Sequence, residues 1–296
     1  MKNTIFRGAA TALVTPMYQD GTVDYESLGK LIEFQISGGI SALVITGTTG
    51  ESSTLTDEEH KEAIRFAVEK TAGRVPVIAG TGSNDTDYAI ALSQYACSVG
   101  VDGLLLVTPY YNKATQKGSI THFTAIANAV DKPIILYNVP SRTGCNLQPA
   151  TVAALAEHPL IVGIKEASGD LSQVAKLAAL CGDRIDIYSG NDDQILPILS
   201  LGGAGVISVL SNLLPGETDQ ICQKFFAGEN EAAKDLQLRY LPLVNALFSD
   251  VNPIPAKAAM SAMGYGENVL RLPLTPMEEQ NKAVLLAEMR KQNILV

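Results

Sequence analysis

The chain has 296 residues, of which 46% are hydrophobic and 18% charged, so it can bury a large core in one barrel-sized domain with an appended segment. Its formal net charge of −9, from 31 acidic and 22 basic residues, gives no support for nucleic acid or an anionic membrane surface as a partner. No apolar run approaches the ~18 residues that a membrane-spanning helix needs, so we expect no membrane association.

Four cysteines are spread along the chain without a Cys-x-x-Cys pair, namely Cys97, Cys145, Cys181 and Cys222. This spacing indicates reduced thiols, and segment 1–8 lacks a secretory hydrophobic region, so we expect a cytoplasmic protein. Cys145 lies in a loop flanked by Gly144 and Asn146, where we expect some exposure, but no base neighbours it in sequence. The three histidines share no motif with a carboxylate, so we expect surface or helix-face positions and no metal site; they are His60, His122 and His158.

Short apolar segments alternate with longer amphipathic segments through the first 226 residues. The expected strands are Gly8–Val14, Ala42–Thr46, Val77–Gly80, Gly103–Val107, Ile134–Asn138, Val162–Lys165, Ile185–Ser189 and Ala204–Ser208. The expected helices are Asp24–Ser37, Asp57–Thr71, Thr86–Ser98, Gln116–Ala129, Gln148–Ala156, Leu171–Leu180, Asp192–Leu199 and Gly216–Phe226. Eight strand-then-helix units with continuously apolar strands predict an α/β fold of the (β/α)8 TIM-barrel class.

The pattern changes after Phe226, where no further strand is expected. The remaining chain predicts three helices, near Asn230–Phe248, Ile254–Met263 and Pro276–Lys291. We therefore expect a catalytic barrel over residues 1–226 and a C-terminal helical region over residues 227–296. The boundary is soft because no low-complexity linker separates the two parts.

Lys165 closes the sixth expected strand, Ile161 to Ile164 being continuously apolar. Active sites of (β/α)8 barrels lie at the C-terminal ends of the strands. Burial disfavours an ammonium and lowers the pKa of a lysine, as an imine-forming lysine requires. The alternative is a structural lysine paired with a carboxylate such as Glu166.

Other polar residues follow neighbouring strands at the same end of the predicted barrel. The loop 47–50, Gly-Thr-Thr-Gly, either presents N–H and hydroxyl groups to a small anion or forms only a tight turn. Tyr137, beside Lys165, either relays a proton or packs in the core. Arg142, on a loop, either grips a carboxylate or forms a surface ion pair. As a set, these groups indicate imine chemistry on a small keto acid.

Three motifs carry a resemblance to a known family. They read Gly47-Thr48-Thr49-Gly50-Glu51, Tyr137-Asn138-Val139-Pro140-Ser141-Arg142-Thr143-Gly144 and Gly163-Ile164-Lys165-Glu166-Ala167-Ser168-Gly169-Asp170. With these motifs in this order, the chain resembles the pyruvate-dependent class I aldolases, the family of dihydrodipicolinate synthase and N-acetylneuraminate lyase, from Arg7 to Lys257. Segments 108–112 and 141–144 favour the synthase branch of that family.

The resemblance implies that Lys165 forms an imine with pyruvate and that the enamine attacks L-aspartate 4-semialdehyde. The product would be 4-hydroxy-tetrahydrodipicolinate, at the first committed step of diaminopimelate and lysine biosynthesis. No cofactor is implied. The family is usually a homotetramer, a dimer of dimers, in which Tyr111 would reach the site of a neighbouring subunit.

The resemblance also implies roles for individual residues. The proton relay would comprise Tyr137, Thr48 and Tyr111. Thr49 would hold the pyruvate carboxylate, Arg142 would hold the carboxylate of the semialdehyde, and backbone groups of Gly190 and Ile207 would line the site.

A lysine effector site at a dimer interface is the last feature that the resemblance implies. Its possible positions are Ser52, Ser53, Asp57, His60, Asn84, Tyr88 and Tyr110. Tyr88 stands where a glutamate is expected to bind the effector's ammonium, and Asp57 stands where a histidine is common. Losing one partner of a charged contact typically costs a few kcal/mol, so we predict weak or absent inhibition by lysine.

Two alternatives remain open. The first is a lyase or aldolase of the same fold for N-acetylneuraminate or a 2-keto-3-deoxy sugar acid, although Arg142 and Tyr110 argue against a polyhydroxylated substrate. The second is a non-catalytic small-molecule sensor, because a fold alone does not fix function. The set of Lys165, Tyr137 and Thr48 argues against the sensor.

Overall fold

The computed structural model describes residues 2–295. Within that part of the chain, eight parallel strands form a closed barrel in chain order, and the last strand pairs with the first. The strands are β1 (Gly8–Ala12), β2 (Ala42–Ile45), β3 (Val77–Gly80), β4 (Gly103–Val107), β5 (Ile134–Asn138), β6 (Ile161–Glu166), β7 (Asp186–Ser189) and β8 (Gly205–Ser208). The predicted (β/α)8 barrel is therefore confirmed, and β3, β4 and β5 have the predicted bounds.

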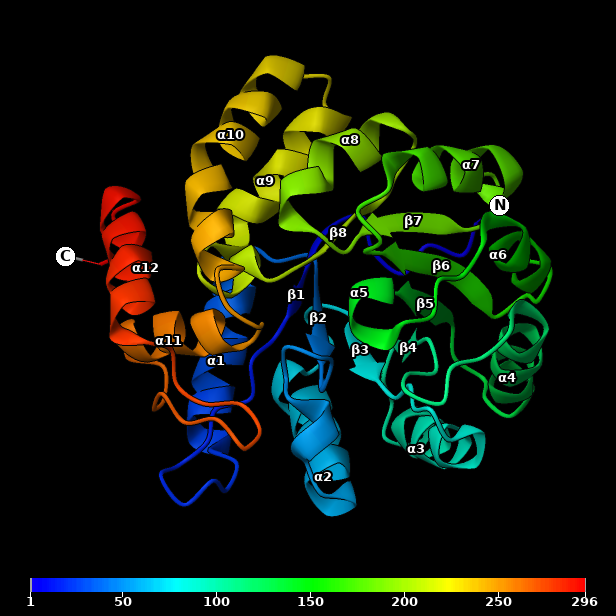
Figure 1. Ribbon diagram of the computed structural model, residues 1–296, viewed down its shortest axis with the longest axis horizontal. Helices are drawn as coiled ribbons and strands as arrows, with labels where there is room; N and C mark the ends of the chain where they lie inside the picture. Colours follow the sequence, from blue (N-terminus) through cyan, green and yellow to red (C-terminus); the bar gives the residue numbers. More distant parts are fainter. Residues whose placement is uncertain (1, 296) are drawn as a thin grey trace.

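Helices surround the barrel, as Figure 1 shows. They are α1 (Tyr25–Ser37), α2 (Asp57–Thr71), α3 (Thr86–Ser98), α4 (Gln116–Asn128), α5 (Pro140–Thr143), α6 (Pro149–Leu155), α7 (Leu171–Cys181), α8 (Ile195–Ser200), α9 (Pro215–Phe226), α10 (Asn230–Leu247), α11 (Ile254–Ala262) and α12 (Glu279–Lys291). Short 3₁₀ turns cover Ser52–Thr54, Asp192–Gln194 and Leu210–Asn212. The sequence did not predict α5 or the turns at Ser52–Thr54 and Leu210–Asn212, because segments this short carry no hydrophobic period. The turn Asp192–Gln194 lies within the helix predicted over Asp192–Leu199.

Helix α2 shows how local sequence fixes an element. Thr56 accepts a hydrogen bond from the Glu59 N–H, and the Glu59 carboxylate accepts one from the Thr56 N–H. This capping box satisfies donors that the first turn of a helix leaves unpaired. The helix therefore begins at Asp57. Because this start is fixed, it also fixes the end of the loop that connects β2 to α2.

Side chains fill the interior of the barrel at the N-terminal ends of its strands. Phe6 stacks on Tyr188 with ring centroids 4.4 Å apart, and the Tyr188 hydroxyl donates to the carbonyl oxygen of Phe6. Small residues such as Ala10 and Ala42 face the same interior and leave room for these two rings. The N-terminal end of the barrel is thus a packed core, and polar groups are left to the C-terminal end.

The C-terminal helices share one hydrophobic cluster with the barrel. Leu243 of α10, Met260 of α11 and Leu285 of α12 pack in the same cluster as Leu31 of α1 and Ile221 of α9. In Figure 1, α10, α11 and α12 lie on the α1 and α9 side of the barrel. The division at residue 227 stays a prediction, but the shared cluster brings the C-terminal segment close to the barrel mouth.

Several positions differ from the sequence-based expectation. His60 and His122 are buried on α2 and α4, so the surface alternative is wrong for both. Cys145 is also buried, because the turn after α5 folds it under Ala114. All four cysteines are free thiols. Across residues 2–295, no helix combines the length and apolarity needed to cross a membrane.

Candidate active site

Lys165 lies near the C-terminal end of β6 and points into the barrel. In the strand register it pairs with Tyr137 on β5 and with Tyr188 on β7. Its Nζ lies 4.3 Å from the centroid of the Tyr137 ring, and the residue is 6% exposed. The amine is therefore buried, with the Tyr137 ring beside it.

The ion pair between Lys165 and Glu166 does not form. Adjacent strand residues face opposite sides of a sheet, so Glu166 points outward to the surrounding helices. Its carboxylate accepts hydrogen bonds from Asn138 Nδ2, Gln173 Nε2 and the Ser168 N–H. Glu166 therefore gives no support to the alternative that Lys165 is a structural lysine in an ion pair.

Burial lowers the pKa of Lys165 from 10.5 to about 7. The Asp192 carboxylate acts in the opposite direction, and the Arg142 guanidinium lowers the value further. Asp192 is itself buried, and burial raises its pKa, although the N–H groups of Val209 and Leu210 donate to its Oδ2 at 2.9 Å. An amine with a pKa near neutrality has a large unprotonated fraction, which is the nucleophilic form.

The loop after β2 offers donors for a small anion. The N–H groups of Gly50 and Glu51 donate to the carbonyl oxygens of Gly47 and Thr48, which closes the turn. Among residues 2–295, the N–H groups of Thr48 and Thr49 have no hydrogen-bond acceptor. Two free N–H groups beside two hydroxyls form a concave donor set suited to a carboxylate.

Tyr137 joins this loop to Lys165. Burial raises the pKa of the Tyr137 phenol, and the charge of Arg142 and the nearby Thr48 hydroxyl offset only part of that effect. The phenol therefore stays protonated at neutral pH and can donate or accept through its one oxygen. Thr48 and Tyr137 line one small cavity, and the Tyr137 ring lies beside the Lys165 amine.

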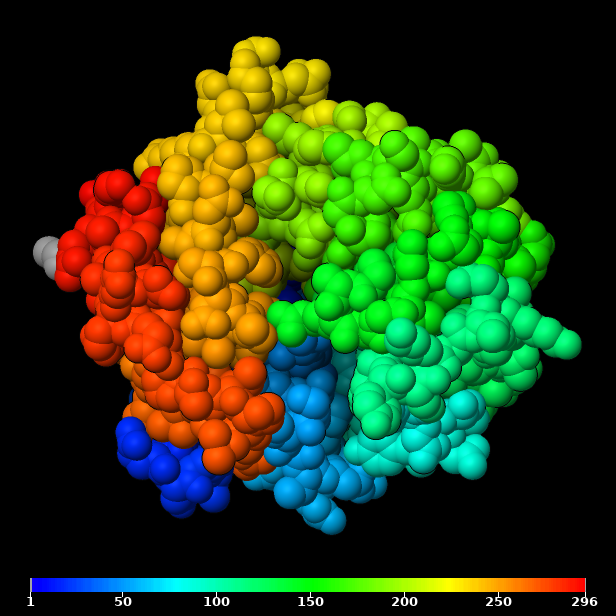
Figure 2. All heavy atoms as spheres, in the orientation of Figure 1, coloured from blue at the N-terminus to red at the C-terminus, as the bar shows by residue number. Residues whose placement is uncertain are grey.

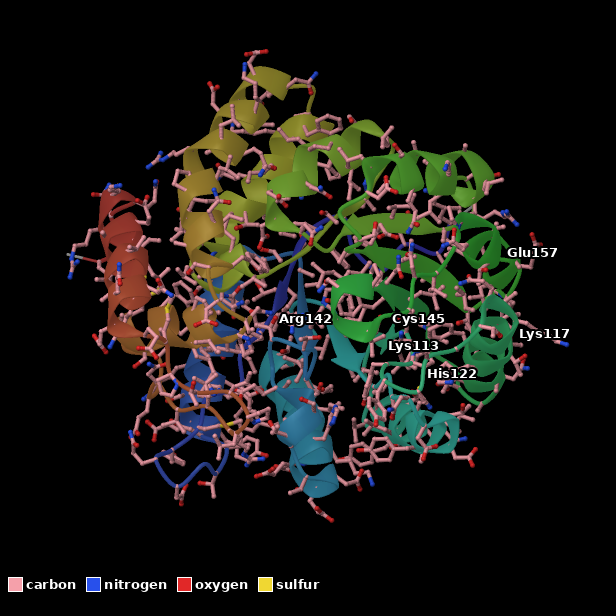
Figure 3. The ribbon with its side chains drawn as sticks, in the orientation of Figure 1. Lys113, Lys117, His122, Arg142, Cys145 and Glu157 are labelled. Carbon is pink, nitrogen blue, oxygen red and sulfur yellow. The ribbon has the colours of Figure 1, made fainter. Side chains whose placement is uncertain are left out.

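Arg142 lies on the short helix α5 rather than on the predicted loop. Its Nη2 donates to the carbonyl oxygen of Asn252 at 3.0 Å. Figure 3 places it near the middle of the viewed face, away from Lys117 and Glu157 at the periphery. Figure 2 shows the molecule hollowed near this position, between the C-terminal helices and the segment around α5.

Gly190 and Ile207 also lie where the site was predicted. A Cβ on Gly190 would come within 2.6 Å of the Ala167 Cβ and within 3.2 Å of the Lys165 Cε, so only glycine leaves space there. The Gly190 N–H already donates to the Glu166 carbonyl oxygen. Ile207 is buried in the barrel interior, in register with Ala10.

Tyr111 is the one predicted catalytic residue that the chain does not bring to Lys165. Its side chain is 92% exposed, on the loop after β4.

The possible effector residues do gather beside the site. A cavity of about 290 Å³ is lined by Thr48 and Arg142 together with Ser52, Ser53, His60, Tyr88 and Tyr110. Asn84 lies beside it and donates to the Tyr110 carbonyl oxygen.

Sequence reasoning missed the contribution of the C-terminal region. Asn252 Nδ2 donates to Thr49 Oγ1 at 2.9 Å, which leaves the Thr49 hydroxyl proton free to point toward a ligand. No motif signalled this contact, because the two residues are separated by 203 positions. Within residues 2–295, no group of three or more His, Cys, Asp and Glu side chains is arranged to hold a metal ion.

Comparisons with known proteins agree with this geometry. Residues 5–292 match the Dihydrodipicolinate synthetase family. The chain is 57% identical over 292 residues to a 4-hydroxy-tetrahydrodipicolinate synthase of Lachnoclostridium phytofermentans, covering 98% of this chain and 99% of that one. It is 44% identical to the chloride-inhibited dihydrodipicolinate synthase of Acinetobacter baumannii, solved in complex with pyruvate, with a TM-score of 0.96 and coverage of 99% and 100%.

A third comparison is with a second solved structure. A dihydrodipicolinate synthase of Cyanidioschyzon merolae, solved with lysine bound, is 42% identical with a TM-score of 0.95, covering 99% of this chain and all of that one. The fold and the relatives define an aldolase-type enzyme of the (β/α)8 class. The chain belongs to the dihydrodipicolinate synthetase family. The family, the enzyme class and the synthase function predicted from the sequence are thereby confirmed.

Proposed function

We propose that Lys165 is the imine-forming residue with which this chain condenses pyruvate and L-aspartate 4-semialdehyde to 4-hydroxy-tetrahydrodipicolinate. The observation that carries the proposal is the buried Lys165 amine, whose pKa is lowered to about 7 and whose Nζ lies over the Tyr137 ring. The unprotonated amine attacks the keto carbon of pyruvate to give a carbinolamine. Loss of water from that adduct leaves the imine.

The later steps need proton transfers that the neighbouring groups are suited to make. Removal of a proton from the pyruvate methyl group gives an enamine, which attacks the aldehyde carbon of the semialdehyde. The semialdehyde's amino group then attacks the former keto carbon, which closes the ring and expels the Lys165 amine. Tyr137, which lies beside Lys165 and lines one small cavity with Thr48, is suited to move protons to and from the departing oxygen.

Two donor sets suit the two carboxylates. Thr49 and the free N–H groups of the loop after β2 are proposed to hold the pyruvate carboxylate, close to the Lys165 amine. Arg142 is proposed to hold the carboxylate of the second substrate, because its guanidinium keeps donors that its single backbone contact does not use. Gly190 and Ile207 would line the site through backbone groups.

A homotetramer is the proposed assembly. Exposed aromatic side chains of this kind are favoured in protein interfaces, and Tyr110 and Tyr111 lie side by side on one loop. In that assembly, Tyr111 would complete the proton relay of a neighbouring subunit. Mixing inactive Lys165→Ala subunits with impaired Tyr111→Phe subunits should restore activity, because a mixed dimer holds one intact site. Activity no higher than that of the separate variants would contradict a role in trans.

A cytoplasmic location is also proposed, since the four thiols are free and none lies in a paired motif.

The activity itself is tested by comparing substrates. The purified chain should consume pyruvate and aspartate semialdehyde together and should leave N-acetylneuraminate unchanged. Cleavage of N-acetylneuraminate at a comparable rate would favour the sugar-acid lyase instead.

A further inference from the structure

A buried ion pair links the C-terminal region to the loop that carries Thr48 and Thr49. Lys257 of α11 donates from its Nζ to Glu51 Oε1 at 2.6 Å, and the two side chains are 2% and 1% exposed. The Arg271 N–H donates to the other carboxylate oxygen of Glu51 at 3.2 Å. Both oxygens of Glu51 are therefore held by residues more than 200 positions away in the chain.

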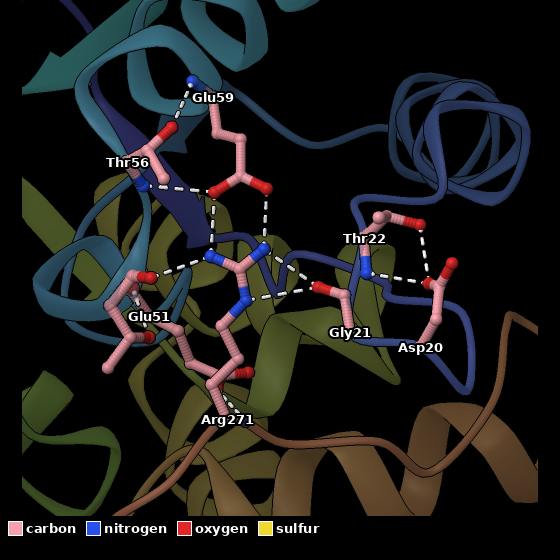
Figure 4. Close-up of polar contacts among 8 residues, drawn as sticks. Asp20, Gly21, Thr22, Glu51, Thr56, Glu59 and Arg271 are labelled. Carbon is pink, nitrogen blue, oxygen red and sulfur yellow. Dashed lines mark hydrogen bonds and ion pairs between the residues drawn. The ribbon is translucent and has the colours of Figure 1, made fainter.

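The same C-terminal segment holds the loop at two further points, as Figure 4 shows for Arg271. The Arg271 guanidinium donates to the carbonyl oxygen of Thr54 at 2.6 Å and to the carboxylate of Glu59, the residue that caps α2. Asn252 donates to the Thr49 hydroxyl. The loop that carries Thr48 and Thr49, here called the donor loop, is thus held by three residues of the C-terminal region. The start of α2 holds the end of the connection that follows it.

The position of Lys257 is unfavourable for its own helix. It lies in the first turn of α11, where the positive end of the helix dipole repels a cation. Burial lowers the pKa of Lys257, and the contact with Glu51 counteracts that effect. Replacing a buried ion pair with apolar residues is often neutral or stabilising, so fold stability alone gives little reason for this pair.

The loop itself needs external support. Glu51 adopts φ 54°, and Thr46, at the other end of the loop, also has φ 54°. Non-glycine residues in this left-handed region are strained and persist only when their surroundings hold them. Without its contacts to Lys257 and Arg271, the Glu51 backbone would relax toward a more common conformation and would shift the free N–H groups of Thr48 and Thr49 with it.

We propose that Lys257 is a positioning residue for the pyruvate carboxylate: through Glu51, it holds the Thr48–Thr49 donor loop in the geometry that binds this anion. This inference rests on the proposed function of that loop. Lys257 acts at a distance from the reacting atoms, so its loss changes the binding of one substrate and leaves the chemistry of Lys165 available once pyruvate is bound.

The test compares Lys257→Met with the wild-type chain and with Lys282→Met. Lys282 is a matched control, because it lies in the same C-terminal region and pairs with Glu279 at 3.3 Å on the surface. The pyruvate concentration that gives half-maximal borohydride-trapped adduct is measured for each, with the KM for both substrates and the melting temperature. In Lys257→Met the half-maximal pyruvate concentration should rise about tenfold, since small displacements of positioning groups weaken productive binding strongly. Lys282→Met should match the wild type.

A second variant separates positioning from the burial of an unpaired charge. Glu51→Gln combined with Lys257→Met removes both charges and should melt near the wild-type temperature, yet its half-maximal pyruvate concentration should stay raised. Its KM for aspartate semialdehyde should change less than its KM for pyruvate. Full recovery of pyruvate affinity in this double variant, or unchanged affinity in Lys257→Met, would overturn the positioning role. Absence of any adduct on the wild-type chain would overturn the proposed function and this inference together.

Discussion

The Lys165 Nζ lies 4.3 Å from the centroid of the Tyr137 ring, and the two residues are paired in register across β5 and β6. Parallel pairing directs both side chains into the same end of the barrel interior, where they share one desolvated space. Desolvation acts on them in chemically useful directions. It lowers the pKa of the amine and raises the pKa of the phenol, so a neutral nucleophile and a protonated acid coexist near neutral pH.

Adduct formation should therefore depend on pH through Lys165. Because the pKa of this amine is lowered to about 7, the trapping rate with pyruvate should rise about tenfold per pH unit well below pH 7 and level off above it. The initial rate of borohydride-dependent mass increase, measured between pH 5.5 and 9, checks this. A rate that still rises about tenfold per pH unit up to pH 9, as expected for the ordinary lysine pKa of about 10.4, would show that the amine is not desolvated.

Replacing Tyr137 with Phe should slow the reaction while keeping the fold. The ring remains to pack beside Lys165, but the hydroxyl that is proposed to transfer protons is lost. Loss of a positioned general acid or base typically costs about 10²- to 10⁴-fold in rate, so kcat should fall within that range. Steady-state kinetics at saturating pyruvate measure the effect, and an equal melting temperature serves as the control. A kcat within about twofold of the wild type would remove Tyr137 from the relay.

Arg142→Ala should mainly weaken use of the second substrate. Within residues 2–295 the guanidinium donates one hydrogen bond, to the carbonyl oxygen of Asn252, so its removal leaves little of the fold unsatisfied. Losing a charged partner of a carboxylate costs about 2 kcal/mol or more, which corresponds to a rise of at least about 30-fold in the KM for aspartate semialdehyde. The pyruvate adduct should still form. Unchanged kinetics with the semialdehyde would count against the assigned role.

Inhibition by L-lysine should be weak or absent. Tyr88 donates from its hydroxyl to Asp57 Oδ1 at 3.2 Å, and Lys61 occupies the other oxygen of the same carboxylate. Within residues 2–295, the side chains that line the neighbouring cavity include no carboxylate for the ammonium of an effector. A steady-state assay over a range of lysine concentrations tests this, with Tyr88→Glu as the variant expected to gain inhibition. Strong inhibition of the wild type at low lysine concentration would refute it.

Local pattern was sufficient for the fold. The strands predicted to end at Gly80, Val107 and Asn138 end at those residues. Because every strand of a parallel barrel ends at one face, the polar residues near the strand ends were predicted to lie at the same end of the barrel as Lys165. These inferences needed only the period of the sequence and the topology that it implies.

Contacts across long separations were not predictable in this way. Asn252, Lys257 and Arg271 reach the loop after β2 only because α10 to α12 pack on the barrel through a shared cluster. The burial of His60 likewise depends on a tertiary contact, in which its Nε2 approaches the Gly80 carbonyl oxygen at 2.9 Å. Helical periodicity places a residue on a face, but it does not say what covers that face.

The central claim is that Lys165 forms an imine with pyruvate. The most direct measurement is reduction of the wild-type chain with sodium borohydride in the presence of pyruvate, followed by peptide mass analysis, with Lys165→Ala treated in parallel. The account predicts one reduced pyruvate adduct, located on Lys165, and neither an adduct nor measurable turnover in Lys165→Ala. An adduct on a different lysine, or no adduct on the wild-type chain, would contradict it.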